Sequence, residues 1–175
     1  MNLLFELSDE GNEIKIKEYE RTRKAARGII VRDDGKIAIQ KKTETNEYKL
    51  IGGGAKDDED IQETFKREVL EEAGCEVEII KCLGIVEESI QSKNAKQFSS
   101  IFVARVIKDL KKTELTEKEK TEGAELIWIT PEEAIKQISN SYDKLVSSTH
   151  TKDYDTTRMR FISLRDRKIL EYYLK

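Results

Sequence analysis

The sequence is poor in the residues that build disulfide scaffolds and cysteine–histidine metal sites. Its 175 residues include two cysteines, Cys75 and Cys82, and a single histidine, His150. Two cysteines are too few for a disulfide scaffold, and one histidine completes no zinc-type motif. We therefore expect buried thiols in a reducing compartment. His150 stands alone in a polar stretch, and contact with a substrate is the less favoured of its two interpretations.

A long apolar run is also missing. Near the N-terminus only Leu3, Leu4 and Phe5 follow one another before the acidic Glu6. Such a run is too short for the core of a signal peptide or for a transmembrane helix. We expect a cytoplasmic protein that makes no contact with a membrane.

Neither sign of charge dominates the chain. Charged residues make up 38% and hydrophobic residues 37%, and the net charge is −3. This balance argues against a protein that binds nucleic acid polymers or anionic membranes. The length suits a single domain over residues 1–175, as a monomer or a homodimer. An acidic enzyme can still act on phosphates when metal ions supply local positive charge.

The most distinctive stretch, residues 50–75, predicts a strand end, a glycine loop and a helix. Three consecutive glycines, Gly52 to Gly54, let the backbone turn sharply and approach a ligand closely. Asp60 followed by Glu63 predicts a capping box at the start of the helix. Gly74 stands where a left-handed residue would end it.

The predicted helix carries three acids that share a face. Glu68, Glu71 and Glu72 have i, i+3, i+4 spacing, and the opposite arc is apolar, with Val69, Leu70 and Ala73. Like charges at this spacing repel one another by roughly 0.2–0.5 kcal/mol per pair. A hard divalent cation with oxygen ligands would reverse that sign. The alternative is an ordinary acidic helix face in solvent.

The spacing of these residues is specific to one family. From Gly53 to Cys75 the chain reads G-x5-E-x7-R-E-U-x-E-E-x-G-U, where U is a bulky apolar residue. This pattern resembles the Nudix box of the MutT/Nudix hydrolases. Two positions depart from it: Cys75 is a small hydrophobe, and Ile51 stands where the family often has proline. The resemblance implies an α/β fold, a Nudix-type α/β/α sandwich with a mixed β-sheet.

The resemblance also implies roles for the acids of the box. Glu68 and Glu72 would be the core metal ligands, and Glu71 a further ligand or the base that orients water. The expected metal is Mg²⁺, with Mn²⁺ possible, because carboxylates prefer these hard cations. Arg67 would orient the catalytic face by pairing with Glu59.

Two assignments in and next to the box, the partner of Arg67 and the role of the three glycines, have an alternative interpretation. From spacing alone, Arg67 could equally pair with Glu63, four residues earlier. Gly52, Gly53 and Gly54 would lie beside the metal and the substrate, or would form only a tight turn.

The family often supplies a further acid from a loop ahead of a late strand that carries tryptophan. Glu122 lies six residues before Trp128. We therefore nominate Glu122 as a metal ligand or base, with Glu125 and Glu88 as alternatives. For Trp128 we favour packing in the core over stacking on a nucleobase.

The resemblance implies a Mg²⁺-dependent pyrophosphohydrolase that cleaves a nucleoside diphosphate linked to another group. A nucleoside triphosphate is the first choice of substrate. Markers associated with the enzymes for ADP-ribose and for dinucleoside polyphosphates are absent, since Pro131 is the only proline and no tyrosine occurs between Tyr48 and Tyr142. ADP-ribose and nucleotide sugars stay open as substrates. The alternative that is not an enzyme is a module that binds nucleotides without catalysis.

The pattern elsewhere predicts strands alternating with helices. Hydrophobic alternation predicts strands at 13–17, 28–31, 36–40, 48–51, 76–86, 98–106 and 126–129, with a hairpin turn at Asp34-Gly35. Helices are expected at 131–139 and 157–175. Polar stretches at 41–46, 87–96 and 141–155 are expected to be loops, and 108–120 a loop or a solvated helix. The basic run at 21–24 is interpreted as a solvated approach to a strand.

Overall fold

The computed structural model describes residues 2–9, 18–147 and 154–175. In these ranges the strands are β1 (Leu3–Ser8), β2 (Arg21–Val31), β3 (Ile37–Lys42), β4 (Glu47–Gly54), β5 (Cys75–Ile90), β6 (Ala95–Asp109) and β7 (Ala124–Ile129). The helices are α1 (Ile61–Ala73), α2 (Glu117–Thr121), α3 (Pro131–Ser147) and α4 (Tyr154–Tyr173), with a 3₁₀ turn η1 (Gln91–Lys93). The predicted strand at 13–17 and His150 lie outside the described residues.

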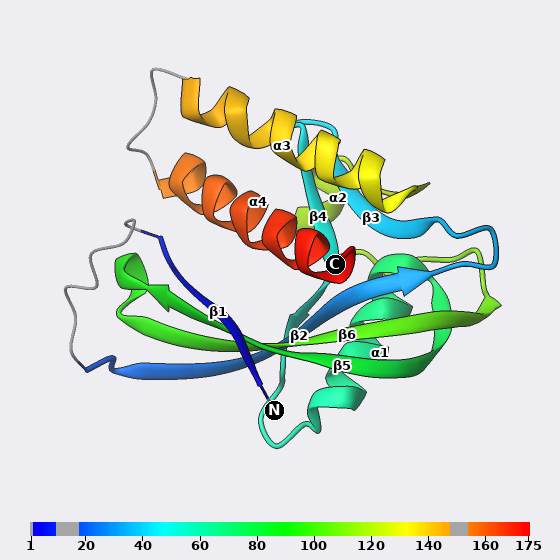
Figure 1. Ribbon diagram of the computed structural model, residues 1–175, viewed down its shortest axis with the longest axis horizontal. Coiled ribbons are helices and arrows are strands. Elements are labelled where there is room, and N and C mark those ends of the chain that lie inside the picture. Colours follow the sequence, from blue (N-terminus) through cyan, green and yellow to red (C-terminus); the bar gives the residue numbers. More distant parts are fainter. Residues whose placement is uncertain (1, 10–17, 148–153) are drawn as a thin grey trace.

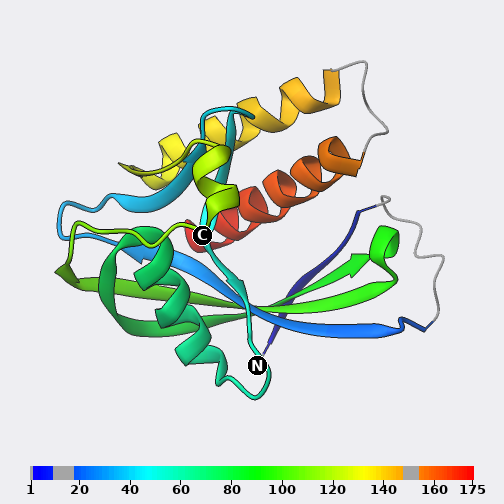
Figure 2. The same cartoon turned by 180° about the vertical axis from the view of Figure 1, so that it is seen from behind.

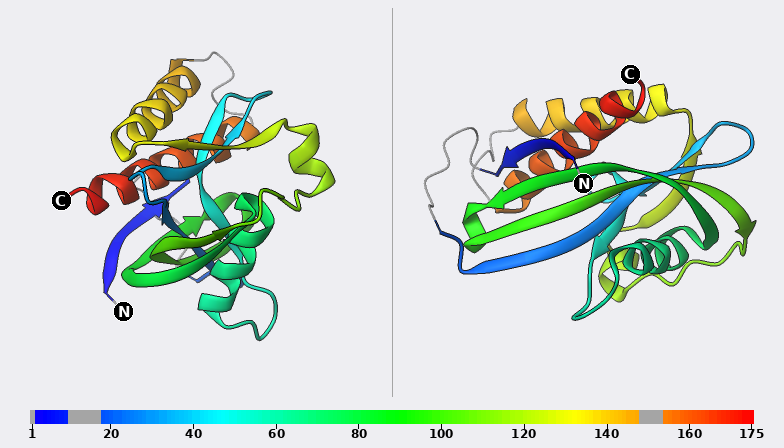
Figure 3. Two further views of the ribbon diagram at one scale, coloured as in Figure 1. Left: turned by 90° about the vertical axis from the view of Figure 1, so that its right-hand side faces the viewer. Right: turned by 60° about the horizontal axis from the view of Figure 1, so that its bottom comes forward.

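The strands form one mixed sheet between two layers of helices. Their order is β1-β5-β6-β2-β4-β3-β7, with β1 parallel to β5 and β2 parallel to β6. Helix α1 covers one face, and α3 and α4 cover the other (Figure 1, Figure 3). This arrangement confirms the expected α/β/α sandwich.

Alternation along the strands supplies a core on each face of the sheet. On β2, Ala26 and Ile30 pack with Phe65 of α1, while Ile29 packs with Ile169 of α4. Successive side chains of a strand point to opposite faces, so one strand serves both cores. Trp128 of β7 packs against the core on the α1 side, as expected.

Strand β4 joins the two halves of the sheet. Residues 51–54 pair with 25–28 of β2, whereas 47–50 pair with 39–42 of β3. Strand β3 therefore leaves β4 at Leu50, and none of the described strands pairs with the glycine stretch on the edge away from β2. Figure 1 shows β4 running from the α3 side towards α1. Backbone donors on that edge are open to side chains.

The hairpin of β5 and β6 is longer than the sequence predicts. The expected loop at 87–96 is wrong, because β5 runs to Ile90 and β6 starts at Ala95, with only η1 between them. Several polar residues in and next to this stretch are buried. Glu88 and Gln97 are buried, and Gln97 Nε2 donates to Glu88 Oε1 over 2.9 Å. Polarity indicated a loop here because side-chain partners were not visible in the sequence.

Helix α3 is also longer than predicted. The loop expected from 141 is wrong over its first turns, because α3 continues to Ser147. Ser141 is buried and its hydroxyl donates to the carbonyl oxygen of Asn46 over 2.9 Å, which fixes this turn on the β3–β4 connection. Within 108–120, a capping box formed by Thr116 and Glu119 starts the short helix α2. The predicted α4 is confirmed.

Candidate active site on the glycine strip and helix α1

Helix α1 begins and ends where the sequence predicts. The Asp60 side chain accepts from the N–H groups of Gln62 and Glu63, and Gly74 ends the helix in the left-handed region, with φ 62°. The predicted capping box is wrong, because the Glu63 side chain forms a 2.8 Å salt bridge with Lys66 and the helix is capped by the Asp60 side chain alone.

The packing face of α1 differs from the prediction in one respect. Phe65, Val69 and Ala73 are buried, but Leu70 is 42% exposed. At about 100° per residue, the arc of these three residues is centred on Val69; Glu72 lies about 60° from that centre and Leu70 about 100°. Glu72 is therefore turned towards the sheet and is 5% exposed, while Leu70 points into solvent.

The glycine strip (Gly52–Gly54) lets α1 approach the sheet. A Cβ atom on Gly53 would lie 2.5 Å from Glu68 Oε2, which is shorter than any normal contact. Gly52 has φ 139°, and a Cβ atom there would lie 2.3 Å from the carbonyl oxygen of Ala26. Side chains in the strip would thus displace the Glu68 carboxylate from the edge of β4.

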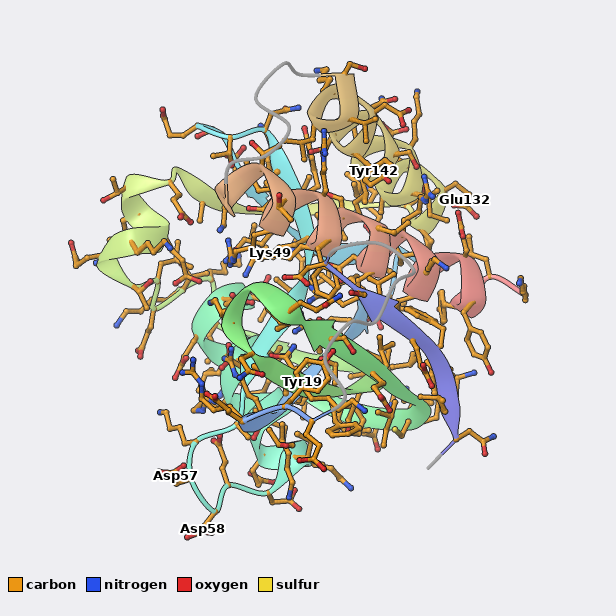
Figure 4. The ribbon with its side chains drawn as sticks, turned by 90° about the vertical axis from the view of Figure 1, so that its left-hand side faces the viewer. Tyr19, Lys49, Asp57, Asp58, Glu132 and Tyr142 are labelled. Atoms are coloured by element: carbon orange, nitrogen blue, oxygen red, sulfur yellow. The ribbon has the colours of Figure 1, made fainter. Side chains whose placement is uncertain are left out.

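Glu72 is held at the free edge of β4. Its Oε2 accepts from the Gly52 N–H and its Oε1 from Lys49 Nζ, both over 2.9 Å. Burial alone would lower the pKa of Lys49, but attraction to Glu72 outweighs it and raises that pKa. Figure 4 shows Lys49 in the interior beneath α4, and Asp57 and Asp58 at the tip of the loop before α1, well away from it.

A second set of contacts surrounds Arg67 and is called the Arg67 group: Arg67, Glu59, Glu68 and Glu71. The Arg67 guanidinium donates from Nε to Glu59 Oε1 over 2.8 Å and from Nη1 to Glu68 Oε1 over 2.7 Å. Nη1 also donates to Glu71 Oε2 over 3.1 Å, and Nη2 to the Gly54 carbonyl over 3.1 Å. The structure therefore places Glu59, not Glu63, opposite Arg67.

Charges in the Arg67 group shift in opposite directions. Hydrogen bonds from Arg67 hold the pKa of Glu59 at about 2. Burial raises the pKa of Glu68, and the nearby Glu72 and Glu71 add to this rise, although Arg67 opposes it. A nearby cation would relieve this repulsion. Within the described part of the chain, no three acids converge as a ready-made metal cluster.

A cavity of about 360 Å³ lies beside the glycine strip. Among the predicted site residues, Gly52–Gly54, Glu68 and Glu72 line it, while Glu71, Arg67, Glu59 and Glu122 do not. The side chain of Glu71 is 37% exposed and contacts Arg67 instead. The carboxylates of Glu68 and Glu72 are the hard oxygen ligands that suit a divalent cation. The structure thus brings together two of the four predicted ligands.

Comparison with known protein families identifies the family of this chain. A family model that describes the NUDIX domain matches residues 21–148, which include the glycine strip and α1. The chain belongs to the Nudix family. It is accordingly a Nudix hydrolase, an enzyme that cleaves phosphoric anhydride bonds. The family generally uses a divalent metal and small nucleotide substrates.

Individual relatives are distant. A MutT-like protein of Streptomyces ambofaciens is 26% identical over 115 residues, which cover 66% of this chain and 68% of that protein. A NUDIX hydrolase from Nitrosomonas europaea is 18% identical with a TM-score of 0.56, covering 68% of this chain and 79% of that one. A MutT NUDIX hydrolase from Burkholderia pseudomallei is 22% identical with a TM-score of 0.52, covering 65% and 86%. The likeness to the solved structures shows the fold.

The structure of this Nudix hydrolase does not bring Glu122 to the cavity. Glu122 Oε2 lies 2.6 Å from Nζ of the buried Lys42, so its carboxylate is held against β3. Glu119, three residues earlier on α2, lines the cavity instead. Figure 2 shows α2 as the short helix in the connection between β6 and β7. The Thr-x-x-Glu capping signal of this helix, at 116–119, was the feature of the sequence that could have singled out Glu119.

The two alternatives to Glu122 are also accounted for. Glu125 makes a surface salt bridge with Lys41 over 2.7 Å. Glu88 lines the cavity but is fully buried, and Arg165 Nη1 donates to its Oε2 over 3.1 Å. Arg165 Nε also donates to Asp166 Oδ1 over 2.8 Å. We call Arg165, Glu88 and Asp166 the Arg165 group.

Sequence reasoning missed the contribution of α4 and of the basic start of β2. Arg23 and Arg27 of β2 line the cavity, as do Arg158 and Arg165 of α4. The run at 21–24 looked like a solvated approach to a strand because nothing nearby in sequence indicated a ligand. Helix α4 follows the residues matched by the family model.

Two remaining expectations concern the membrane and the cysteines. No helix in the described ranges is both long and apolar enough to cross a membrane. Both cysteines are thiols, but only Cys75 is buried, and burial raises its pKa to about 11. Cys82 is exposed, so the expectation of two buried thiols is wrong for that residue.

Proposed function

We propose that this Nudix hydrolase is a Mg²⁺-dependent pyrophosphohydrolase that cleaves a nucleoside diphosphate linked to another group. The observation that supports this most is the shared cavity. Two buried or half-buried carboxylates, Glu68 and Glu72, face it beside the glycine strip, and basic side chains such as Lys49 and Arg27 line it as well. Such a cavity suits an anionic phosphate chain together with a cation.

Glu68 and Glu72 would hold the metal, with Mn²⁺ as the alternative ion. When bound, a divalent ion supplies positive charge that stabilises the phosphate oxygens and activates water. Glu119 contacts Glu72 and lines the cavity, so it replaces Glu122 in our proposal as the acid supplied by a later segment. Glu71 stays a proposed ligand or base that would have to turn away from Arg67 on metal binding.

The supporting residues keep the acids in place. Arg67 links Glu68 to Glu59 and to the glycine strip, and it would fix the carboxylate direction while remaining outside the cavity. We keep Arg67 as a positioning residue and Glu59 as its support. Gly52–Gly54 would border the substrate, because these glycines line the cavity and have no side chains of their own to fill it.

A nucleoside triphosphate is our first proposed substrate, as for a MutT-like enzyme, and the MutT-like relative supports this choice. ADP-ribose and nucleotide sugars are the alternatives. A nucleotide-binding module without catalysis is less favoured, because every acid of the box is present. We further propose one domain over 1–175, as a monomer or homodimer in the cytoplasm, with no binding to nucleic acid polymers.

A phosphate-release screen tests the proposal. Nucleoside triphosphates, ADP-ribose, dinucleoside polyphosphates and nucleotide sugars are offered with Mg²⁺ and then with Mn²⁺. Glu68→Gln and Glu72→Gln should each lower turnover by about 100-fold or more, because metal charge supplies most of the stabilisation. Glu78→Gln is the matched control, since Glu78 is exposed and pairs with Arg105 away from the cavity.

A melting assay with and without Mg²⁺ adds a readout that does not depend on turnover. The wild-type Tm should rise with Mg²⁺, and that rise should disappear in Glu72→Gln. Full Mg²⁺-dependent activity in both cavity variants would refute the proposed site. Saturable nucleotide binding without phosphate release would favour the binding module instead.

A further inference from the structure

Besides Lys93 of η1, five basic side chains line the cavity, and they fall into two kinds. Lys49 pairs with Glu72, and Arg165 pairs with Glu88 and Asp166. Three others, Arg23, Arg27 and Arg158, line the same cavity but have no acid within salt-bridge distance among the described residues. We call these three the open arginines.

Arg27 is the most informative of the open arginines because it is 94% buried, with 6% of its surface exposed. It lies on β2 opposite Gly52, and it shares the α4-facing side of the strand with Ile29. Within the described part of the chain, its one hydrogen bond runs from Nε to Ser99 Oγ over 3.4 Å. The remaining N–H groups of its guanidinium are therefore left for a ligand.

The fold does not stabilise the charge of Arg27. Burial and the neighbouring Arg165 lower the pKa of Arg27, although Glu88 and Asp166 attract its charge. A buried cation with few hydrogen bonds is costly to a protein unless something neutralises it. An anion in the cavity would do so.

The other two open arginines approach the same space from different elements. Arg23 lies four residues before Arg27 and thus on the same face of β2. Its Nη2 lies 2.1 Å from the position of a Cβ atom on Gly54, so this guanidinium rests against the glycine strip. Arg158 comes from the beginning of α4. Strand and helix thus supply cations to one cavity.

We propose that the open arginines bind the terminal phosphate of the substrate. This inference rests on the proposed function, in which the acids of α1 hold the metal and the diphosphate that is cleaved. Guanidinium groups match phosphate oxygens with paired N–H donors. The site would favour substrates with a phosphate beyond the scissile diphosphate, such as nucleoside triphosphates. In ADP-ribose and nucleotide sugars a neutral sugar stands at that end.

Kinetics on two substrates tests this assignment. Arg27→Gln and Arg158→Gln are compared with Arg105→Gln, an exposed arginine on the neighbouring β6 that pairs with Glu78. Loss of a charged hydrogen bond should lower kcat/KM for a nucleoside triphosphate by about 10- to 100-fold. The value for ADP-ribose should fall by less than about threefold, within the range of a surface change. Equal losses on both substrates, or none, would overturn the assignment.

Binding without metal tests the same site independently of hydrolysis. Isothermal titration with inorganic tripolyphosphate in metal-free buffer should show binding to the wild type that weakens about tenfold in Arg27→Gln and Arg158→Gln. Arg105→Gln should bind like the wild type. Unchanged binding in both cavity variants would overturn the proposal. Equally tight binding of orthophosphate would also overturn it, since that would indicate a site for free phosphate.

The outcomes separate this inference from the proposed function. If no substrate is hydrolysed but tripolyphosphate binding depends on Arg27, the phosphate site stands and the enzymatic proposal falls. If hydrolysis needs Mg²⁺ and Glu72 but the arginine variants hydrolyse and bind like the wild type, the enzymatic proposal stands and the phosphate site falls. The Tm of each variant should lie within about 3 °C of the wild type. Should Arg27→Gln fail to fold, Arg158→Gln decides, because Arg158 is only half-buried.

Discussion

The Arg67 group and the Arg165 group each consist of one arginine and the acids that it contacts. They differ in the solvent exposure of their side chains and in the sequence separation of their members. The Arg67 group links residues at most 12 positions apart, and its side chains are partly exposed, with Glu71 37% exposed. In the Arg165 group, Glu88 is 77 positions away from Arg165, and no side chain is more than 4% exposed. The first group orients acids of the proposed catalytic face, whereas the second joins α4 to the sheet.

Depth decides what each group contributes. Exposed ion pairs stabilise proteins by about 0–1 kcal/mol, because water competes for both charges. Buried pairs contribute little net stability when formed, but removal of one partner leaves an uncompensated charge. The Arg165 group should therefore govern folding, and the Arg67 group activity.

The largest expected effect is that of Arg165→Met. This change leaves Glu88 and Asp166 buried without their cation, and Asp166 also accepts from the Leu50 N–H of β4. We expect a loss of about 3–5 kcal/mol in the free energy of unfolding, seen as a fall of roughly 10 °C in Tm. Arg105→Met, at an exposed pair, should shift Tm by less than about 2 °C. Similar Tm values for both variants would contradict the contrast in depth.

The second prediction is acid sensitivity set by Glu88. Burial alone would raise its pKa, but Arg165, Arg27 and hydrogen bonds from Ser99 and Gln97 lower it from 4.5 to about 2. A lowered pKa in the folded state means that the charged form stabilises the fold. That stabilisation is complete above about pH 4.5 and is lost as the pH falls towards 2, on the order of 3 kcal/mol.

Melting curves measured between pH 5 and pH 2.5 check this prediction. Wild-type Tm should fall steeply over that range, and Glu88→Gln should show a lower Tm at pH 5 with a flatter slope. Glu59→Gln is the matched comparison, since the pKa of Glu59 is also about 2 but its side chain reaches solvent. If Glu59→Gln flattened the slope more than Glu88→Gln, depth would not be the deciding property.

The same contrast explains what the sequence could predict. The Arg67 group, the Asp60 cap and the Gly74 stop all lie within one short segment, where helical spacing fixes which side chains meet. Pairing of Arg67 with Glu59, which precedes α1, was implied by the family resemblance, because helical spacing alone equally allowed Glu63. The sandwich fold followed from the order of strands and helices together with the family resemblance.

The remainder depended on contacts between distant segments. Glu88 looked like a loop residue because its partners lie on α4 and on the adjacent strand. Glu119 and Glu122 are three residues apart in a charged stretch, and only the pairing of Glu122 with Lys42 shows which one faces the cavity. The spacing of residues within one segment does not predict which side chains of distant segments they contact.

The smallest expected change in stability comes from two acids at the start of α1, Glu59 inside the Arg67 group and Glu63 outside it. Glu59→Gln removes the charge that holds Arg67, so Glu68 should lose its orientation and kcat should fall by roughly 10- to 100-fold. Glu63→Gln removes an exposed acid that pairs with Lys66, and kcat should change by less than about twofold. Both variants should melt within about 3 °C of the wild type. Equal losses of activity would show that Arg67 is not oriented through Glu59, since the two acids differ in that contact while lying at the same end of α1.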